Sequence, residues 1–327
     1  MTQDMVNLSD LCYNLTACSG RVAASPALAL LYVCSAAAVL FTVSGNLLVI
    51  ISVCHFRQLH TPTNLLILSL AVSDFLVGLF LMPVHLTMLV ESCWIFGEMF
   101  CLLYNMISYQ ITFVSIHNVS LVAVERYVAL SNPFFYVKRV SISVIFIASL
   151  MIWVLSLSYN CSLLYFNGIF SHFKICPGQC FLTIDELWST VDLFVIFVLP
   201  CATMIILYIK IFAIAKRHAV AIRANVKCRE VQNSDSMKSE WKAAKVFGVL
   251  VSVFLICLVP YYVCILLDDF IKGQNVYDVI TNMVMLFYLN SAINPVIYAL
   301  FYPWFQNSMK MILTCKILGA DSSLKHV

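Results

Sequence analysis

The chain has 327 residues, of which 62% are apolar and only 11% are charged, and its formal net charge at pH 7 is +3. Soluble domains carry about 25% charged residues, so this composition excludes an ordinary soluble enzyme and indicates a polytopic membrane protein. The first residues are polar and contain no apolar core preceded by basic residues, so we expect no cleaved signal peptide.

Seven apolar stretches follow one another along the chain, and each is long enough to cross a bilayer. A helix needs about 20 apolar residues to cross about 30 Å of hydrocarbon, whereas a barrel strand needs only about 10. We therefore predict an all-α integral membrane protein, a seven-helix bundle within residues 25–302. A short amphipathic helix and a cytoplasmic tail are expected over 303–327. The predicted spans are residues 27–53, 62–90, 99–125, 141–163, 188–213, 245–267 and 277–302.

The basic residues place the N-terminus outside the cell. The outer side then carries only Arg21, Lys174 and Lys272. Apart from Arg126 at the end of a span, all other Lys and Arg residues lie in inner loops, at inner span ends or in the tail. Positive charge on the inner side is the rule for membrane proteins, so we expect a multi-pass plasma-membrane protein. The inner loop over about 218–239 is predicted to be too short for an enzymatic domain.

The extracellular tail, residues 1–24, contains the sequons Asn7-Leu-Ser and Asn14-Leu-Thr, which we expect to carry glycans. Six cysteines on the outer side are expected to pair, because that compartment is oxidising. A bridge from Cys101 to Cys180 would draw the loop before the fifth span across the mouth of the bundle, but spacing alone leaves the connectivity open. The six are Cys12, Cys18, Cys93, Cys101, Cys176 and Cys180.

The fifth span contains a single charge, because Asp192 is the only charged residue from Leu187 to Ile209. A carboxylate within a span is costly unless it faces protein or water and meets a cation. No Lys or Arg lies in the outer half of a predicted span, and His85 is the one weak internal candidate, so we expect a cation from outside. The alternative is that Asp192, about 12 Å above Pro200 along a helix, reaches the headgroups.

A second acid, Asp74, lies in the second span among polar residues of the first, third and seventh spans. Such oxygen atoms can hold a hydrated Na⁺. The alternative is a cluster of interhelical hydrogen bonds, each contributing about 0.6 kcal/mol. The candidate residues are Asn46, Asp74, Ser115, Asn290, Ser291 and Asn294.

The third span ends with Glu125-Arg126-Tyr127. Arg126 either snorkels to the inner headgroups or pairs with Glu240 at the inner start of the sixth span. The pair would hold two helix ends together and break when the inner side opens. Prolines are expected to kink four spans, which suits a bundle that rearranges. These are Pro83, Pro200, Pro260 and Pro295.

No catalytic constellation is visible in the sequence. It has no metal-ligand spacing, no Gly-rich phosphate loop and no nucleophile beside a base, so we expect neither an enzyme nor a cofactor beyond an allosteric Na⁺. The membrane architecture leaves lipid as a partner and excludes nucleic acid. A small-solute transporter would show an internal repeat, and none is visible.

Several of these residues, in this order, resemble those of rhodopsin-like G-protein-coupled receptors over about residues 25–315. The stretch Asn290–Phe305 and the segment Cys176-Pro-Gly-Gln-Cys180 are similar to the trace amine-associated receptor family. The resemblance implies disulfides Cys101–Cys180 and Cys18–Cys176, with Cys18 preferred to Cys12. The matching residues are Gly45-Asn46, Leu70-Ala-Val-Ser-Asp74, Cys101, Glu125-Arg126-Tyr127, Trp153, Pro200, Tyr208, Pro260 and Asn294-Pro295-Val-Ile-Tyr298.

This resemblance implies amine sensing at an outer cavity and coupling to a stimulatory heterotrimeric G protein, with an olfactory role in most members. It also implies that Ile116, Pro200 and Phe254 repack as a connector during activation. Arg126, Tyr208 and Tyr298 would then meet the G protein. The remaining motif residues implied in activation are Glu125, Tyr127, Asn294 and Pro295.

The chain departs from the pattern of amine receptors at two positions. Those receptors carry an aspartate eighteen residues before the Arg of Glu-Arg-Tyr, and this position is Ser108 here. A fish branch of the family instead carries an aspartate in the fifth span, eight residues before the proline, where Asp192 stands. Leu258 replaces the tryptophan expected two residues before Pro260, so the usual toggle is not expected.

We therefore expect the ammonium group of a small amine to bind Asp192. Nearby ring faces would add about 0.5–2 kcal/mol each through cation–π contact, and we expect at most two of four tyrosines to do so. The alternative is a receptor for a ligand that is not an amine, with Asp192 packing against a helix or the lipid interface. The candidate ligand-binding residues are Asp192, Ser108, Tyr109, Thr112, Tyr261, Tyr262 and Tyr288.

Overall fold

The computed structural model describes residues 26–91, 93–169, 178, 180, 182, 184–224, 231–267 and 276–318. Within them, seven helical segments are long and apolar enough to cross a membrane, which confirms the predicted all-α bundle. The segments are α2 (Pro26–His55); α3 (Pro62–Leu76), η2 (Val77–Leu81) and α4 (Met82–Glu91); α5 (Glu98–Ser131); α7 (Ile142–Phe166); α9 (Glu186–Asp192), η3 (Leu193–Val198) and α10 (Leu199–Ala224); α11 (Val231–Leu267); and α12 (Val276–Phe301).

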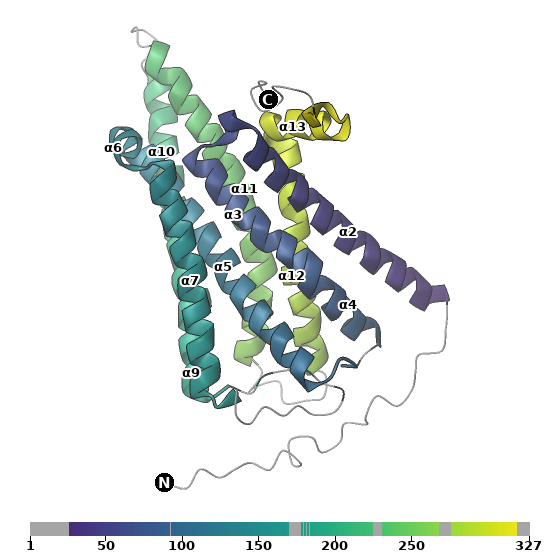
Figure 1. The fold of residues 1–327 in the computed structure, drawn as a ribbon. Helices are drawn as coiled ribbons and strands as arrows, with labels where there is room; N and C mark the ends of the chain where they lie inside the picture. The colour runs from purple at the N-terminus through teal and green to yellow at the C-terminus, as the bar shows by residue number, and fades with distance from the viewer. Residues whose placement is uncertain are drawn as a thin grey trace.

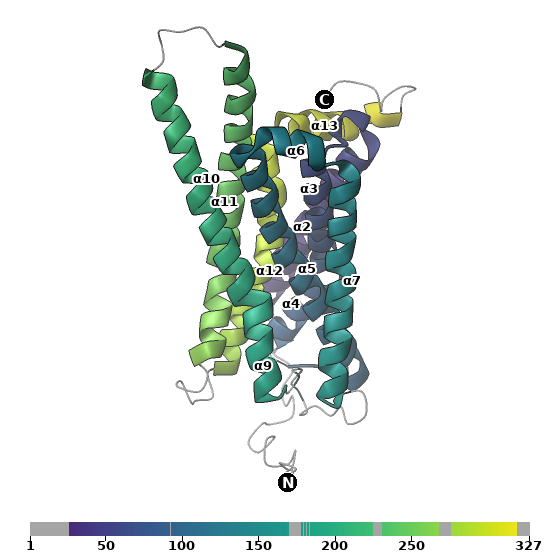
Figure 2. The ribbon, with the colours of Figure 1, turned by 90° about the vertical axis from the view of Figure 1, so that its left-hand side faces the viewer.

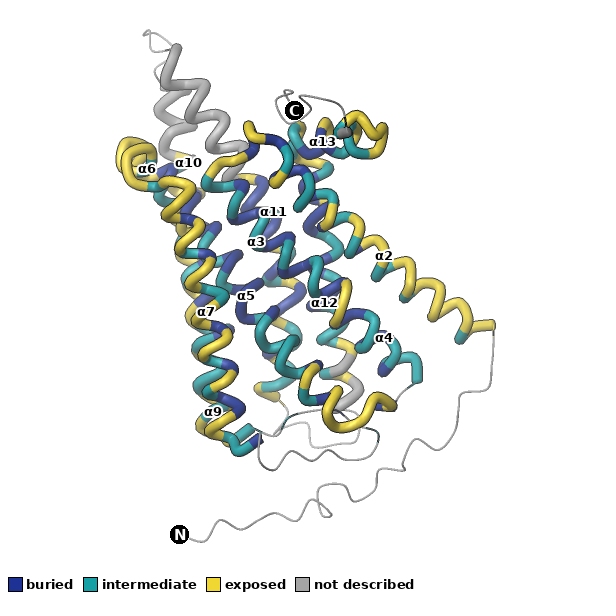
Figure 3. The backbone as a smooth tube through the Cα atoms, viewed as in Figure 1, coloured by how far each residue is buried: buried dark blue, intermediate teal, exposed yellow. Residues whose placement is uncertain are grey.

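The seven segments run along a common direction, with α5 at the centre in both views (Figure 1, Figure 2). Helix α5 contacts α3, α7, α10 and α11. Dark, buried positions lie on the faces that the helices turn toward one another, whereas the outer half of α2 is exposed (Figure 3). Lipid is as apolar as these exposed side chains, so the spans can present hydrophobic residues outward without a stability penalty.

Among the residues that the structure describes, four short elements lie outside the spans: η1 (Arg57–Leu59), α6 (Pro133–Arg139), α13 (Pro303–Leu313) and η4 (Lys316–Leu318). Helix α13 lies across the inner end of the bundle (Figure 1). It buries Phe305 and Ser308 while Lys310 and Leu313 stay exposed. The predicted amphipathic helix after the seventh span is therefore confirmed.

The prolines of the second and fifth spans each follow a π-helical turn. Pro83 would place its ring against the carbonyl of Leu79, and Pro200 against that of Ile196, since a proline clashes with the carbonyl four residues earlier. Both carbonyls lie inside π turns, η2 and η3. The wider turn moves the carbonyl away from the ring, which is a recognised cause of helix bending.

Pro295 is accommodated differently, by a side chain from another helix. The carbonyl of Ser291 loses its partner because Pro295 has no N–H. Asn46 Nδ2 on α2 donates to that carbonyl at 3.0 Å and to the Thr42 carbonyl at 2.9 Å. A polar side chain thus satisfies backbone that the proline freed, as membrane proteins require. Gly45 lets the two helices approach, since a Cβ there would lie 3.0 Å from the Pro295 ring.

The inner ends of the fifth and sixth spans correct one prediction. The sequence predicted a loop over about 218–239, but α10 continues to Ala224 and α11 begins at Val231. The predicted ends of the two spans were set by where the apolar residues stop. Residues 214–224 contain four Ala, one Lys and two Arg, which favour helix in water, so α10 extends beyond the predicted apolar span.

One disulfide joins Cys101, at the start of α5, to Cys180 in the loop before α9, with the Cα atoms 5.6 Å apart. Sequence spacing left this pairing open, and the structure contains the bridge that the family resemblance implied. Cys93 also takes part in a disulfide. Cys18 and Cys176, and the sequons at Asn7 and Asn14, lie outside the described residues.

The contact between Gly45 and Pro295 predicts the response to a small substitution. Gly45→Ala would place a methyl group against a rigid ring and should lower the unfolding free energy by about 1–3 kcal/mol, as overpacking does. Gly248→Ala is the matched control, because its new Cβ would meet Phe212 at an ordinary 3.5 Å. Thermal unfolding of the purified protein in detergent measures both, and equal effects would contradict the close approach.

Candidate functional site

The outer site centres on Asp192, the last residue of α9, directly above the π turn of η3. Its carboxylate is half-buried and faces the interior of the bundle, because Tyr159 on α7 donates its hydroxyl to Asp192 Oδ1 at 3.1 Å. This bond directs the carboxylate toward a neighbouring helix, which favours a position between helices over one that reaches the headgroups.

Three further tyrosines lie near enough to this carboxylate to interact with its charge, Tyr109 on α5 and Tyr261 and Tyr262 on α11. The Tyr262 ring stacks on Phe197 of η3, with centroids 4.3 Å apart. Together with Tyr159, they bring phenols from three helices near one carboxylate. The sequence placed Tyr109, Tyr261 and Tyr262 at this level.

Tyr159 was missed by the sequence-based prediction. It lies in the fourth span, whose residues are apolar on nearly every side, so its helical face could not be read from the sequence. Its ring also packs against Phe113 of α5 at 5.8 Å, which fixes its position between α5 and α9. The sequence offered one indication that Tyr159 belongs to the site, which is its position in the outer half of a span.

A second polar array lies beside the first. Ser108 Oγ and the Tyr288 hydroxyl are 3.0 Å apart, and the Tyr288 and Tyr104 hydroxyls are 3.1 Å apart. The Tyr104 hydroxyl lies 3.2 Å from His85 Nδ1. These four side chains come from α5, α12 and α4, so the array ties three spans together. Thr112 lies half-buried one helical turn below Ser108.

This array corrects the interpretation of His85. The sequence offered His85 as a weak internal partner for Asp192, but its ring is buried and bonds to Tyr104 instead. The Tyr288 ring packs edge-on against the imidazole at 5.3 Å. The sequence shows that His85 lies near the outer end of its span. The orientation of α4 about its own axis decides which neighbouring helix the side chain faces, and the sequence does not show this.

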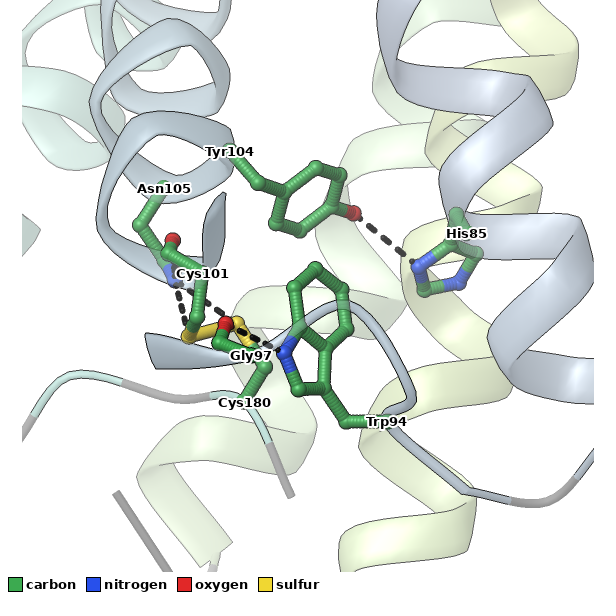
Figure 4. Close-up of a disulfide and its surroundings, with 7 residues drawn as sticks. All are labelled: His85, Trp94, Gly97, Cys101, Tyr104, Asn105 and Cys180. Carbon is green, nitrogen blue, oxygen red and sulfur yellow. Dashed lines mark hydrogen bonds between the residues drawn. A yellow bond between two sulfur atoms is a disulfide. The ribbon is translucent and has the colours of Figure 1, made fainter. Parts of the chain in front are cut away.

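The extracellular loops cover the array from outside. The Trp94 indole N–H donates to the Gly97 carbonyl at 2.9 Å, and the Trp94 ring packs on Tyr104 at 5.7 Å. Asn105 Nδ2 donates to the Cys101 carbonyl at 2.9 Å beside the disulfide. Figure 4 shows the Tyr104 hydroxyl directed toward His85, with Trp94 and the Cys101–Cys180 bridge nearby. The disulfide thus fixes the side of the site that faces the extracellular space.

A hollow of about 760 Å³ lies elsewhere, over the outer turn of α5. Its lining includes Met99, Phe100 and Leu103, all of which are exposed. These apolar, outward-facing side chains belong to the lipid-facing surface. The hollow is therefore separate from the polar site around Asp192.

Near the bundle centre, Asp74 is buried among amides and hydroxyls. Asn294 Nδ2 donates to Asp74 Oδ2 at 2.7 Å. Ser115 Oγ donates to the Oγ of Ser73, the residue before Asp74, at 3.1 Å. Asn290 and Ser291 are buried on α12 within one turn of Asn294. The structure therefore joins Asp74 to Asn294 and places Ser115 and the buried residues of α12 close along the chain to this pair.

Several buried oxygens in this cluster have no hydrogen-bond donor among the described residues. They are Asn46 Oδ1, Asp74 Oδ1, Asn290 Oδ1 and Asn294 Oδ1. Buried polar atoms without a protein partner are rare and generally indicate an ion or a water molecule. Oxygen atoms are also the ligands that hard cations prefer. The cluster therefore fits a hydrated cation on its own chemistry.

At the inner end, Glu125 and Arg126 form a buried ion pair at 2.5 Å. Thr63 Oγ1 donates to Glu125 Oε1 at 2.9 Å, and Arg126 Nη2 donates to Thr63 Oγ1. The Tyr136 hydroxyl on α6 also donates to Glu125 Oε1. Thr63 and Tyr136 were missed from the sequence because they lie in different elements. The predicted partner Glu240 lies on α11 outside the side chains that the structure describes, so that pair stays a prediction.

The Tyr136 phenol is a stable donor in this cluster. Burial, first, and the negative charge of Glu125 together raise the pKa of Tyr136 to about 12. The phenol therefore keeps its proton at neutral pH and donates to the carboxylate. Arg126 also lies over the Phe247 ring at 5.7 Å, and Lys210 lies over Tyr127 at the same distance. The inner cluster thus links α3, α5, α6, α10 and α11.

Six further residues implied in activation lie in the core between the two ends. All of them are buried, and Phe254 packs edge-on against Phe287 at 6.4 Å. Leu258 is also buried, where the resemblance expected a tryptophan. An aliphatic side chain there has no ring to rotate. The buried residues are Ile116, Pro200, Tyr208, Phe254, Asn294 and Tyr298.

The chain is similar to known receptors over most of its length. Residues 45–298 match the family model described as "7 transmembrane receptor (rhodopsin family)". Trace amine-associated receptor 13c of Danio rerio is 38% identical over 89% of this chain and 88% of its own. Trace amine-associated receptor 7e of Mus musculus is 39% identical over 98% and 92% of the two chains. Trace amine-associated receptor 4 of Rattus norvegicus is 34% identical over 92% and 90%.

The inner cluster predicts energetic coupling between Tyr136 and Glu125. Tyr136→Phe and Glu125→Gln should each lower the unfolding free energy, but the double variant should be no less stable than Glu125→Gln alone. Hydrogen bonds to charged groups contribute about 1.5–3 kcal/mol, so the coupling energy should lie near that range. Additive effects would contradict the contact.

The same coupling has a predicted pH dependence. The pKa of Tyr136 is raised above the ordinary value of 10. The contribution of the phenol is therefore full below about pH 10 and is lost as the pH rises through about 12. The coupling energy should be the same at pH 6 and pH 8. A loss within that interval would show that Tyr136 is not the donor.

Proposed function

Because the chain belongs to the rhodopsin family of seven-transmembrane receptors and, within it, to the trace amine-associated receptors, we propose that it binds a small amine at its outer end and signals to a heterotrimeric G protein at its inner end. The chain is a multi-pass protein of the plasma membrane with its N-terminus outside. Membership of this family makes it a receptor and not an enzyme. The single observation that carries the amine proposal is the position of Asp192 inside the bundle.

Asp192 needs a cation that the described part of the chain does not supply. Its one hydrogen bond there comes from the neutral Tyr159, and no Lys or Arg of that part lies within ion-pair distance. A buried carboxylate without a positive partner is costly. An ammonium ion that enters from outside removes this cost and gains charge-assisted hydrogen bonds.

The surrounding phenols suit an ammonium group. Tyr159 occupies one carboxylate oxygen and leaves the other for the ligand. The faces of Tyr109 and Tyr261 can contribute cation–π attraction, about 0.5–2 kcal/mol each. The site therefore combines one negative charge with ring faces, as ammonium recognition requires.

The position of the carboxylate points to one branch of the family. Ser108 stands where most amine receptors carry an aspartate, and it bonds to Tyr288. The ammonium would therefore bind to Asp192 on the fifth span and not to a residue at position 108 on the third. We therefore assign the chain to the branch, found in fish, whose aspartate lies in the fifth span.

The signal is proposed to pass through a stimulatory G protein and raise cAMP, in a chemosensory role. Arg126 is held by Glu125 and Thr63 and lies over Phe247 of α11, which keeps the inner ends of α3, α5 and α11 together. A ligand activates only if it binds the open state more tightly than the closed one. Closure of α11 onto Asp192 through Tyr261 and Tyr262 would supply that difference, with Leu258 moving by translation of the helix.

An allosteric Na⁺ is proposed at Asp74. The buried oxygens of Asp74, Asn290 and Asn294 would hold the hydrated ion, with Ser115 and Ser291 beside them. The ion would supply positive charge to a buried carboxylate. It would stabilise the arrangement of α3, α5 and α12 in which these oxygens converge.

A ligand that is not an amine is the second candidate. It would leave Asp192 bonded only to Tyr159, and the charge would then serve helix packing alone. A panel of amines and neutral analogues of equal size, tested for cAMP in cells that express the chain, separates the two candidates.

Replacement of Asp192 tests the proposed ammonium contact. Asp192→Asn keeps the shape but removes the charge, and the amine response should fall by at least about 100-fold in potency, because charge-assisted hydrogen bonds are lost. Asp185→Asn is the matched control, since Asp185 is an exposed carboxylate two turns away. Surface expression is measured for both. A normal response from the Asp192 variant would remove the assignment.

Tyr159→Phe tests how the carboxylate is positioned. The variant loses one donor to Asp192 but keeps the ring that packs on Phe113, so potency should fall about 3- to 30-fold while the maximal response is kept. Tyr165→Phe on the same helix is the control, because its side chain is 71% exposed. Increased potency would show that Tyr159 competes with the ligand and does not orient the carboxylate.

A further inference from the structure

Hydrogen-bond distances join Ser108, Tyr288, Tyr104 and His85 into an array that is separate from the bond between Tyr159 and Asp192. It contains three hydroxyl groups and one imidazole nitrogen, joined by contacts of 3.0, 3.1 and 3.2 Å. Tyr288, Tyr104 and His85 are at most 9% exposed, whereas Ser108 is only half-buried. Any ligand that meets this array therefore meets it at Ser108.

Hydrogen bonds along these three contacts can run in either of two directions, and His85 Nδ1 selects between them. A hydroxyl donates one proton and accepts two, and an imidazole nitrogen either donates or accepts. If His85 Nδ1 accepts, each hydroxyl donates toward His85, and Ser108 keeps an acceptor lone pair for the ligand. If Nδ1 carries a proton, every hydroxyl donates in the opposite direction, and Ser108 keeps a proton for the ligand.

The array and the carboxylate lie within reach of one molecule. Ser108, which contacts Tyr288, and Phe113 lie five residues apart on α5. The Phe113 ring packs at 5.8 Å on Tyr159, and Tyr159 donates to Asp192. A ligand whose ammonium sits at Asp192 can therefore extend along α5 and end at Ser108.

We propose that Ser108, supported by Tyr288, Tyr104 and His85, is a second binding subsite that accepts a hydroxyl group at the far end of the amine, which makes amino alcohols the preferred ligand class. This inference rests on the proposed function, since it presumes an ammonium at Asp192. It adds the chemistry of the other end of the ligand.

A hydroxyl group fits this subsite better than the other common ends. It can donate to Ser108 or accept from it, so it matches both arrangements of the array. An ammonium only donates, and the four members of the array supply no carboxylate to balance its charge. An alkyl end would displace water from Ser108 and leave its remaining hydrogen-bonding capacity unfilled, which is unfavourable for a buried polar group.

The test compares alkylamines, terminal amino alcohols and terminal diamines of matched length over a series of chain lengths. Cells expressing the full chain report cAMP for the wild type and for Ser108→Ala, Tyr288→Phe and Ser158→Ala. Ser158 is an exposed hydroxyl on α7 that bonds to its own helix, so its variant is the matched control. The readout is the potency ratio of amino alcohol to alkylamine, because a damaged binding site would weaken both ligands alike.

At the best chain length, the wild type and Ser158→Ala should prefer the amino alcohol by about 3- to 10-fold, the value of one net hydrogen bond. Ser108→Ala should reduce the ratio to about one while the alkylamine still acts, and Tyr288→Phe should reduce it in the same direction.

Three results would overturn the inference while leaving the amine proposal intact. They are an equal potency of alkylamine and amino alcohol in the wild type, an unchanged ratio in Ser108→Ala, and a diamine preferred to the amino alcohol at every length. If no amine of any class acts on surface-expressed protein, the proposed function itself fails.

Discussion

The bundle depends on one constraint: within hydrocarbon, every polar group must find its partner inside the protein. The seam between α2 and α12 shows how the constraint shapes the fold. Pro295 frees the carbonyl of Ser291, Asn46 donates to that carbonyl, and Gly45 allows the approach that makes the bond possible. A kink that would weaken an isolated helix thereby becomes a specific contact between two helices.

The same constraint is met differently at the two ends of the molecule. At the inner end, Glu125 has a full set of partners, with Arg126, Thr63 and Tyr136 all bonded to it. At the outer end, Asp192 has a single neutral donor in the described part of the chain. A satisfied charge stabilises one arrangement of helices, whereas a charge lacking its counter-ion gives an incoming cation a reason to bind. The asymmetry suits a protein that senses outside and responds inside.

The outer site also shows what stands at the Ser108 departure from the pattern of amine receptors. Where that pattern has a carboxylate, Ser108 contacts Tyr288, and the contacts continue through Tyr104 to His85. This hydrogen-bonding array lies beneath Trp94 and the Cys101–Cys180 disulfide. The carboxylate of Asp192 and the array are therefore two chemically different parts of the outer end.

By itself, the sequence determined the seven spans, their orientation and the presence of a lone acid in the fifth, because apolar length, basic residues and charge are local properties. It also grouped the residues around Asp74 and named three of the tyrosines near Asp192. Tertiary structure alone decided that Tyr159 meets Asp192 and that His85 meets Tyr104, since these contacts depend on how each helix is rotated about its axis. Nearly uniform apolar spans carry little information about rotation, so the partners of a buried polar group become visible only when the helices are packed.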